Sequence, residues 1–251
     1  MYSWSSKRKL IYIGSIFAVL FLFIFIPYIF RSYKKPTCFD QRKNQGELGI
    51  DCGGPCAVRC DLQIIKLKIL WSKSFEIVNG VYSAVALIEN PNINIRTDNL
   101  AYIFRLKDKS GGILSEITGR TFIPNLRTLA IFESGFRTDK EPATADFEFI
   151  EGALWKHDET RPADIAVRSK VFSKLDNSPR LDVKVENKSF QNIEKLEIIA
   201  IIYNSSKEAI GASRTFIDDF KRDGVEDIVF TWPQSFKGEP AIIEIFTKIV
   251  S

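Results

Sequence analysis

The sequence predicts an all-β protein, in which two tandem β-sandwich repeats follow one transmembrane helix and a small disulfide-rich module. Three observations support this prediction. Apolar and polar side chains alternate from residue 62 onward, all four cysteines lie in one short segment, and one long apolar run stands near the N-terminus. Alternation with a period of two is typical of strands that bury one face.

The apolar run extends from Leu10 to Phe30, over 21 residues without a formal charge. A helix needs about 20 apolar residues to cross the hydrocarbon core of a bilayer. We therefore predict a short cytoplasmic tail over 1–9 and a transmembrane helix over 10–30 that contacts membrane lipid. A cleaved signal peptide would have a shorter core and a small-residue cleavage site. The basic stretch over 31–35 instead favours an uncleaved signal anchor.

The excess of basic residues behind the net charge of +4 lies at the two ends of this apolar run. Residues 1–35 contain no acidic side chain, and the rest of the chain has 29 basic and 31 acidic residues. The basic residues at the two ends are Lys7, Arg8, Lys9, Arg31, Lys34 and Lys35. Since the remainder is not a polycation, we expect no nucleic-acid partner.

The four cysteines lie within 23 residues, in a module placed at 36–61; they are Cys38, Cys52, Cys56 and Cys60. An even number of cysteines in a short loop-rich segment indicates disulfides in an oxidising compartment. Zinc held by four thiolates and a thiol-redox pair are the alternatives, and the pairing stays open. If disulfides form, the N-terminus is cytoplasmic and the bulk of the chain is extracytoplasmic.

The segment from Cys38 to Cys60 resembles the C-x-D-x3-N-x2-E-x3-D-C-G-G-x-C module of bacterial exported and surface proteins, many of them uncharacterised. The last spacing departs from that pattern, because three residues separate Cys56 from Cys60. The polar residues on the pattern are candidate Ca²⁺ ligands, since Ca²⁺ prefers hard oxygen atoms; they are Asp40, Asn44, Glu47 and Asp51. The alternative is that they cap turns and bind the backbone.

Two similar halves follow, at 62–156 and 162–251. In each half a strand ends in a Glu-Asn pair, at Asn90 and at Asn187, and precedes a second strand and a polar hairpin. The offset is near 97 residues, which suits one β-sandwich per repeat. We expect a polar linker over 156–162.

These halves resemble the small immunoglobulin-like modules of bacterial envelope proteins, including the F-x-L-Y-D type. The residues that carry the resemblance are Val185-Glu186-Asn187 and Ile202-Tyr203-Asn204. The resemblance implies two tandem immunoglobulin-like β-sandwiches. The large aromatic residues at strand positions are interpreted as core; they are Phe132, Phe136, Trp155, Phe230, Trp232 and Phe236.

No motif of catalysis stands out in this sequence. It has no phosphate-binding glycine loop, no H-E-x-x-H and no G-x-S-x-G, and its one histidine, His157, lies in the predicted linker. We therefore expect a protein that is not an enzyme and has no small-molecule substrate. The sequence predicts a membrane-anchored envelope protein that presents two β-sandwiches to an envelope or surface protein partner. A membrane-tethered Ca²⁺ or Zn²⁺ module is the alternative, and a thiol-redox component ranks below it.

Overall fold

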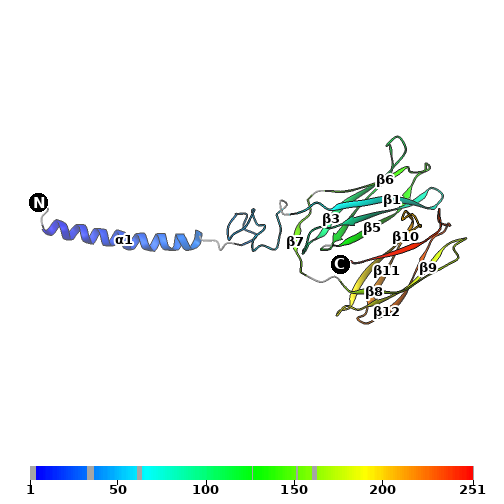
Figure 1. The fold of residues 1–251 in the computed structure, drawn as a ribbon. Helices are drawn as coiled ribbons and strands as arrows, with labels where there is room; N and C mark the ends of the chain where they lie inside the picture. Colours follow the sequence, from blue (N-terminus) through cyan, green and yellow to red (C-terminus); the bar gives the residue numbers. More distant parts are fainter. Residues whose placement is uncertain are drawn as a thin grey trace. The chain divides into compact units, whose positions relative to one another are not determined.

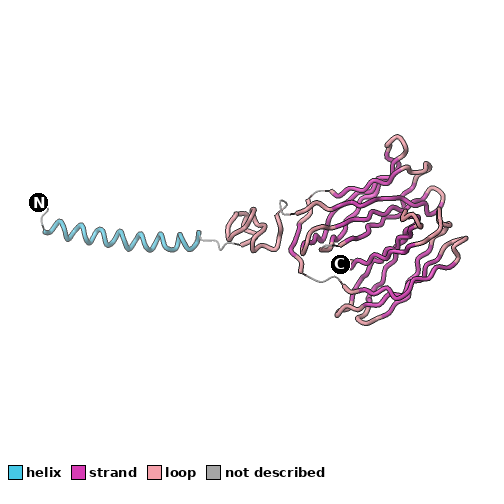
Figure 2. The backbone as a smooth tube through the Cα atoms, viewed as in Figure 1, coloured by secondary structure: helices cyan, strands magenta, loops and turns pink. Residues whose placement is uncertain are grey.

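The computed structural model describes residues 4–32, 37–60, 64–125, 127–150, 152–159 and 163–250. The chain separates into two compact units, Met1–Cys56 and Ala57–Ser251. Figure 2 shows a helix in the first unit and strands through most of the second. The predicted β-rich class of the chain beyond the helix is confirmed.

The first unit begins with helix α1, Trp4–Ser32, which includes the predicted apolar run. Every side chain from Tyr12 to Tyr28 is exposed. Among the parts of the chain that the structure describes, no helix is both long and apolar enough to cross a membrane. A helix is therefore present where we predicted one, but the predicted membrane span is not seen. Lys34 and Lys35, which we expected to flank it, lie outside the described residues.

The second unit contains two pairs of antiparallel sheets (Figure 1). The first sheet pair consists of β1-β2-β5 and β4-β3-β6, with β7 also paired to β3. Its strands are β1 Lys68–Val78, β2 Val81–Glu89, β3 Ile95–Lys107, β4 Ile113–Ile123, β5 Thr128–Arg137, β6 Thr144–Phe149 and β7 Trp155–His157. The two sheets enclose an apolar core that contains Phe104, Phe136 and Ile88.

The second sheet pair consists of β12-β9-β8 and β11-β10-β13. Its strands are β8 Ile165–Ser173, β9 Arg180–Asn187, β10 Ile193–Tyr203, β11 Ala209–Phe220, β12 Val225–Thr231 and β13 Ile242–Ile249. Its core contains Leu181, Ile198 and Phe230. Strands β8 to β13 repeat the order of β1 to β6, because β9 takes the place of β2 and β10 that of β3. The two halves therefore share one topology.

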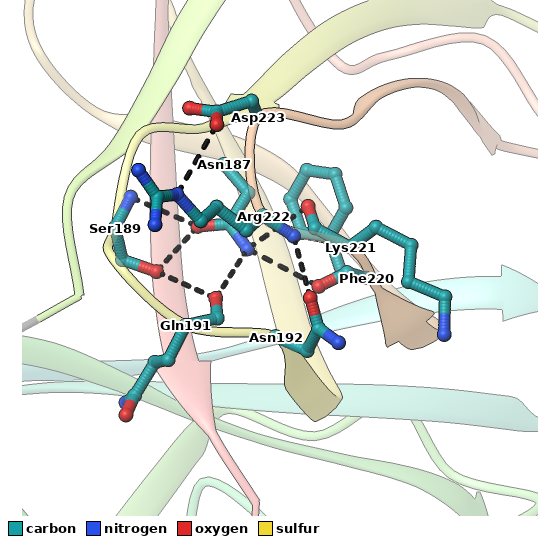
Figure 3. Close-up of polar contacts among 8 residues, drawn as sticks. All are labelled: Asn187, Ser189, Gln191, Asn192, Phe220, Lys221, Arg222 and Asp223. Carbon is teal, nitrogen blue, oxygen red and sulfur yellow. Dashed lines mark hydrogen bonds and ion pairs between the residues drawn. The ribbon is translucent and has the colours of Figure 1, made fainter.

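An asparagine marks the same corner in each sheet pair. Asn90 and Asn187 are fully buried and stand 97 residues apart, at the Glu-Asn pairs seen in the sequence. The Nδ2 of Asn187 donates to the carbonyls of Gln191, Phe220 and Lys221, at 3.0 to 3.1 Å (Figure 3). The Nδ2 of Asn90 donates to the carbonyls of Ile95 and Pro124, at 3.1 and 2.6 Å. Each asparagine thus ties the end of one strand to segments that flank strands of the facing sheet.

A third buried cluster joins the two sheet pairs, and we call it the junction. It draws apolar side chains from the first pair and from the second; they are Val85, Leu87, Ala130 and Phe132, and Ile199, Ile201, Tyr203, Ala209 and Ala212. Sheet β1-β2-β5 therefore packs on sheet β11-β10-β13. The four sheets form four successive layers, with β4-β3-β6 and β12-β9-β8 outside.

The junction corrects the expectation that each strand buries one face. In β2 every residue from Tyr82 to Ile88 is buried, and in β10 every residue from Leu196 to Tyr203 is buried. One face of each strand lies in its own core and the other lies in the junction. Uninterrupted apolar runs are typical of strands covered on both sides.

Two local predictions differ from the structure. The alternation over 65–71 predicted a strand with a buried face, yet Ile65 and Ile69 are exposed. The strand begins only at Lys68 and has an irregularity in register between Ile69 and Trp71, and a bulge of this kind interrupts the alternation.

The predicted linker over 156–162 is the second difference. Lys156 and His157 belong to β7 and pair with β3, whose Ile95 and Arg96 are their partners. Neighbouring Trp155 is buried, and its burial stabilises the pairing of the polar residues Lys156 and His157 with β3. Residues 160–162 lie outside the described part of the chain.

Candidate functional site

All four cysteines are disulfide-bonded, as predicted. Cys38 pairs with Cys56 across a sequence separation of 18 residues. Cys52 and Cys60 are disulfide-bonded as well, and no described cysteine is free. A four-thiolate zinc site needs ionised thiols, so these cysteines do not form one in this structure.

The structure brings the four candidate Ca²⁺ ligands together in the first unit. Asn44 Nδ2 donates to Asp40 Oδ2 at 2.8 Å. The carboxylate of Asp51 accepts the backbone N–H of Asp40 at 3.0 Å, and that of Glu47 accepts the N–H of Asp51 at 3.2 Å. These bonds match the turn-capping alternative. Calcium binding here stays a prediction; Asn44 Oδ1 is buried without a hydrogen-bond partner among the described residues.

The glycine pair of this module has a structural cause. Gly53 and Gly54 have φ values of +73° and +56°, in the left-handed region that glycine adopts without strain. A Cβ atom at Gly54 would lie 2.3 Å from the carbonyl oxygen of Gly46. The D-C-G-G element therefore requires glycine for a tight turn beside Cys52.

The pKa of the Asp40 carboxyl is lowered from its ordinary value, chiefly by the hydrogen bond from Asn44. The ionised group therefore stabilises the module above pH 3.8, and this contribution is lost as the pH falls through the folded-state pKa. We expect Asn44→Ala to raise the pKa of Asp40 toward its ordinary value, measured by NMR titration of the carboxyl carbon. The pKa of Asp182, lowered by its bond to Arg180, is the internal control. An unchanged Asp40 pKa would contradict this assignment.

A charged cluster lies beside the junction in the second unit. The buried carboxylate of Glu197 on β10 is 3.3 Å from Arg214 Nη1 and 2.7 Å from Lys248 Nζ. Lys248 also donates to Thr121 Oγ1 of the first sheet pair at 2.9 Å, and Arg214 donates to the Phe132 carbonyl at 2.9 Å. The two cations therefore link the second sheet pair to the first.

A cavity of about 360 Å³ adjoins this cluster. The hydroxyl of Tyr102, which lines it, donates to Glu133 Oε1 at 2.5 Å. Burial, followed by this bond and by the charge of Glu133, raises the pKa of Tyr102, so the phenol stays neutral. Each of these polar groups has a partner within the fold, and the bonds of Arg214 and Lys248 stabilise the contact between the two sheet pairs.

Removing the Lys248 charge should destabilise the protein. We expect Lys248→Met to lower the free energy of unfolding by about 2–3 kcal/mol, because buried Glu197 keeps only Arg214 as a partner. The matched control is Lys237→Met. Lys237 pairs with Glu141 at 3.4 Å between the same two sheet pairs, but both side chains are more than three-quarters exposed, so a loss below about 1 kcal/mol is expected. Urea unfolding measures both; equal losses would contradict the role of Glu197.

A larger cavity of about 680 Å³ opens between the two sheet pairs at another place. Four segments line it, namely 72–77, 141–146, 208–213 and 231–237. Of the aromatic residues interpreted as core, Phe132 and Trp232 reach this cavity while buried, and Phe236 is half-buried. The core assignment is confirmed for the five that are buried, namely Phe132, Phe136, Trp155, Phe230 and Trp232.

His157 has a structural role. Arg59 Nη2 donates to its Nδ1 at 3.0 Å, because a guanidinium only donates. Its Nε2 is then the protonated nitrogen and lies 2.9 Å from Glu159 Oε1. Both ring nitrogens are therefore engaged in hydrogen bonds at the end of β7.

Comparison with known proteins does not assign a family. No protein-family model matches the chain, and no curated sequence matches it. Among solved structures, a Bacteroides uniformis β-glucuronidase covers 68% of this chain at 14% identity and a TM-score of 0.24. B. uniformis β-glucuronidase 2, with bound cyclophellitol-6-carboxylate aziridine, covers 73% at 10% identity and the same TM-score of 0.24. The chain spans only 25% and 30% of the length of these enzymes, respectively.

The sequence pattern did not predict the charged cluster of Glu197, Arg214 and Lys248. Glu197 lies within an apolar run of β10, and a lone acid in such a run is the one sequence signal from which a buried ionic partner could have been predicted. Arg214 and Lys248 gave no signal, because each lies on a strand with other polar residues. Their meeting point depends on how the sheet pairs stack.

Proposed function

We propose that this is a non-catalytic envelope protein that holds two β-sandwiches as one fixed body and presents them to a protein partner. Equivalent strand positions in the two halves carry this proposal. Hairpin residues Asp108 and Asn204 accept equivalent backbone bonds, at 3.0 Å from Gly111 and from Lys207. Arg105 precedes Asp108 by the same number of residues as Ile201 precedes Asn204, so the two occupy equivalent positions. Arg105 lies on the outer sheet β4-β3-β6, whereas Ile201 lies in the junction.

Strands β2 and β9 show the same replacement of an apolar residue in the junction by a charged residue on an outer sheet. The asparagine corners align β2 with β9, so Val85 and Leu87 of the junction correspond to Asp182 and Lys184 of the free sheet β12-β9-β8. Apolar residues thus occur where the sheet pairs meet, and charged residues occur on the outer layers. This pattern supports a fixed pair of β-sandwiches whose two outer sheets face solvent. Polar outer faces are expected where no further repeat packs on the ends of an array.

We propose further that the sheet pairs are immunoglobulin-like modules of the F-x-L-Y-D type and that α1 anchors the protein in a membrane with its N-terminus in the cytoplasm. The first proposal is supported by the repeated topology and by the two buried asparagines. The second is supported by the exposed apolar side chains from Tyr12 to Tyr28, and by disulfides that indicate an extracytoplasmic module.

The anchor and the binding role are tested on the full chain. Alkaline carbonate extraction of expressing cells should leave the protein in the membrane pellet, and protease added outside should digest the second unit. Immobilised full-length protein in detergent should retain a specific envelope protein, released by excess soluble competitor. Recovery in the carbonate supernatant would overturn the anchor, and turnover of a small molecule by the purified chain would overturn the non-catalytic role.

A further inference from the structure

The disulfide-bonded segment 37–56 of the first unit exposes three large apolar side chains. They are Phe39, Leu48 and Ile50, with exposed fractions of 83%, 57% and 63%. The segment consists of turns and loops (Figure 2), and Cys56 is the one apolar side chain that is buried in it. Because the segment contains no apolar core that could cover them, the three side chains form an exposed apolar surface.

Hydrogen bonds place these three side chains in neighbouring loops. In the turn over 48–52 the first two N–H groups donate to the last carbonyl, each at 3.1 Å, and Ile50 lies in the middle of the turn. The residue after it, Asp51, accepts the N–H of Asp40 at 3.0 Å, and Phe39 directly precedes Asp40. Phe39 therefore lies beside the turn that carries the other two apolar side chains.

The acidic and basic side chains of this segment differ in exposure. Its three acids, Asp40, Glu47 and Asp51, are buried or half-buried and accept hydrogen bonds from within the module. Its two basic residues, Arg42 and Lys43, are exposed. The exposed surface thus combines apolar and basic side chains and leaves the acids of the segment inside. This combination matches the interfacial region of a membrane, where anionic headgroups lie above apolar chains.

The length of chain between α1 and this segment limits how far apart the two can lie. Helix α1 ends at Ser32, and Cys38 is tied to Cys56 by a disulfide. A chain extends by at most about 3.6 Å per residue, so Cys38 lies within about 22 Å of Ser32. If α1 ends among lipid headgroups, the segment is within reach of the same membrane surface.

We propose that this surface docks on the lipid headgroups of the membrane in which α1 is anchored. The inference rests on the proposed anchor and adds a second contact with lipid to it. Phe39, Leu48 and Ile50 would bury their side chains at the boundary of the acyl chains, while Arg42 and Lys43 would pair with anionic headgroups. The disulfide-bonded loops hold these side chains in place beforehand, which lowers the entropy cost of docking.

Photo-crosslinking of the full chain in lipid vesicles tests the docking. The vesicles contain equal parts of phosphatidylcholine and phosphatidylglycerol, benzoylphenylalanine replaces one phenylalanine at a time, and mass spectrometry detects lipid adducts. We expect Phe39→benzoylphenylalanine to give a lipid adduct. The same replacement at Phe21, an exposed residue of α1, reports on the anchor. Phe190, which is 89% exposed in the second unit, is the matched control and should give none.

The outcomes separate the docking from the anchor. Lipid adducts at Phe39 and Phe21 but not at Phe190 would support both. A lipid adduct at Phe21 without one at Phe39 would overturn the docking and leave the anchor standing, whereas no adduct at Phe21 would overturn the anchor. Equal lipid adducts at Phe39 and Phe190, or an adduct of Phe39 to a second copy of the chain in place of lipid, would also overturn the docking.

A charge variant tests the role of the basic residues in the same vesicles. In the chain that carries benzoylphenylalanine in place of Phe39, Lys43→Ser should lower the ratio of lipid adduct to unmodified chain about fivefold, the contribution of one basic side chain near an anionic surface. The control is Lys109→Ser, which removes an exposed lysine from the hairpin between β3 and β4 and should leave the ratio unchanged. Intact disulfides, checked by mass spectrometry, show that the module has kept its fold. Equal ratios for the two variants would overturn docking on anionic headgroups.

Discussion

Ile201→Arg is expected to lower the free energy of unfolding by about 3–5 kcal/mol, the cost of an uncompensated charge in a buried position. Ile201 is fully buried in the junction, between Ala212 of β11 and Glu244 of β13 in the strand register. The guanidinium would lie against the apolar face of the first sheet pair, around Val85 and Leu87. The variant therefore tests whether the two sheet pairs form one cooperative body.

The reverse change at the equivalent position is the control. Arg105 lies on a free outer sheet, where it pairs with Glu148 at 2.8 Å and with Glu116 at 3.4 Å. Surface ion pairs contribute little to stability, so we expect Arg105→Ile to change the free energy of unfolding by less than about 1 kcal/mol. Urea unfolding followed by intrinsic fluorescence measures both variants.

A specific outcome would contradict the four-layer arrangement. If Ile201→Arg and Arg105→Ile cost the same, the two positions are in similar environments and the junction does not form in solution. If the sheet pairs are coupled, Ile201→Arg should also split one unfolding transition into two, because each pair keeps its own core. The control variant should keep a single transition.

The sequence allowed prediction of features that depend on local pattern. Alternation of apolar and polar residues indicated the strands, and the repeated Glu-Asn pair located Asn90 and Asn187 at equivalent places. Clustered cysteines indicated disulfides. The membrane span also followed from local pattern, but no described helix meets that requirement.

Features that depend on the meeting of distant surfaces were not predictable. The run from Leu196 to Tyr203 could be read as a strand, but its second buried face implies a partner sheet that no local pattern specifies. Similarly, the carboxylate oxygens of Asp40 and Asp51 could either bind a metal ion or cap turns by accepting backbone N–H groups. Only the direction of the backbone N–H groups distinguishes the two, and that direction depends on the disulfide-bonded loop.

Asn187, the buried asparagine of the second sheet pair, should contribute to the free energy of unfolding about as much as a buried side chain of the junction. We expect Asn187→Ala to lower the free energy of unfolding by about 3 kcal/mol, because buried groups that lose a hydrogen-bond partner cost about 1–3 kcal/mol each. The groups concerned are the carbonyls bound by its Nδ2 and the N–H and hydroxyl of Ser189 bound by its Oδ1, at 3.0 and 2.5 Å (Figure 3). The Tm should fall by about 6–12 °C.

Two comparisons make this prediction specific. Asn90→Ala removes the equivalent residue, whose Oδ1 accepts the N–H and the Nδ2 of Asn92 at 3.0 and 2.9 Å, so a similar loss is expected. Asn204→Ala removes an asparagine from an exposed hairpin, where it accepts the N–H of Glu208 at 2.9 Å, and water replaces that bond at a cost below about 1 kcal/mol. Thermal unfolding of the three variants should therefore give two large losses and one small one. If Asn187→Ala lowered the Tm no more than Asn204→Ala, the prediction would be wrong. The end of β9 would then be held to the facing sheet by strand packing and not by the hydrogen bonds of Asn187.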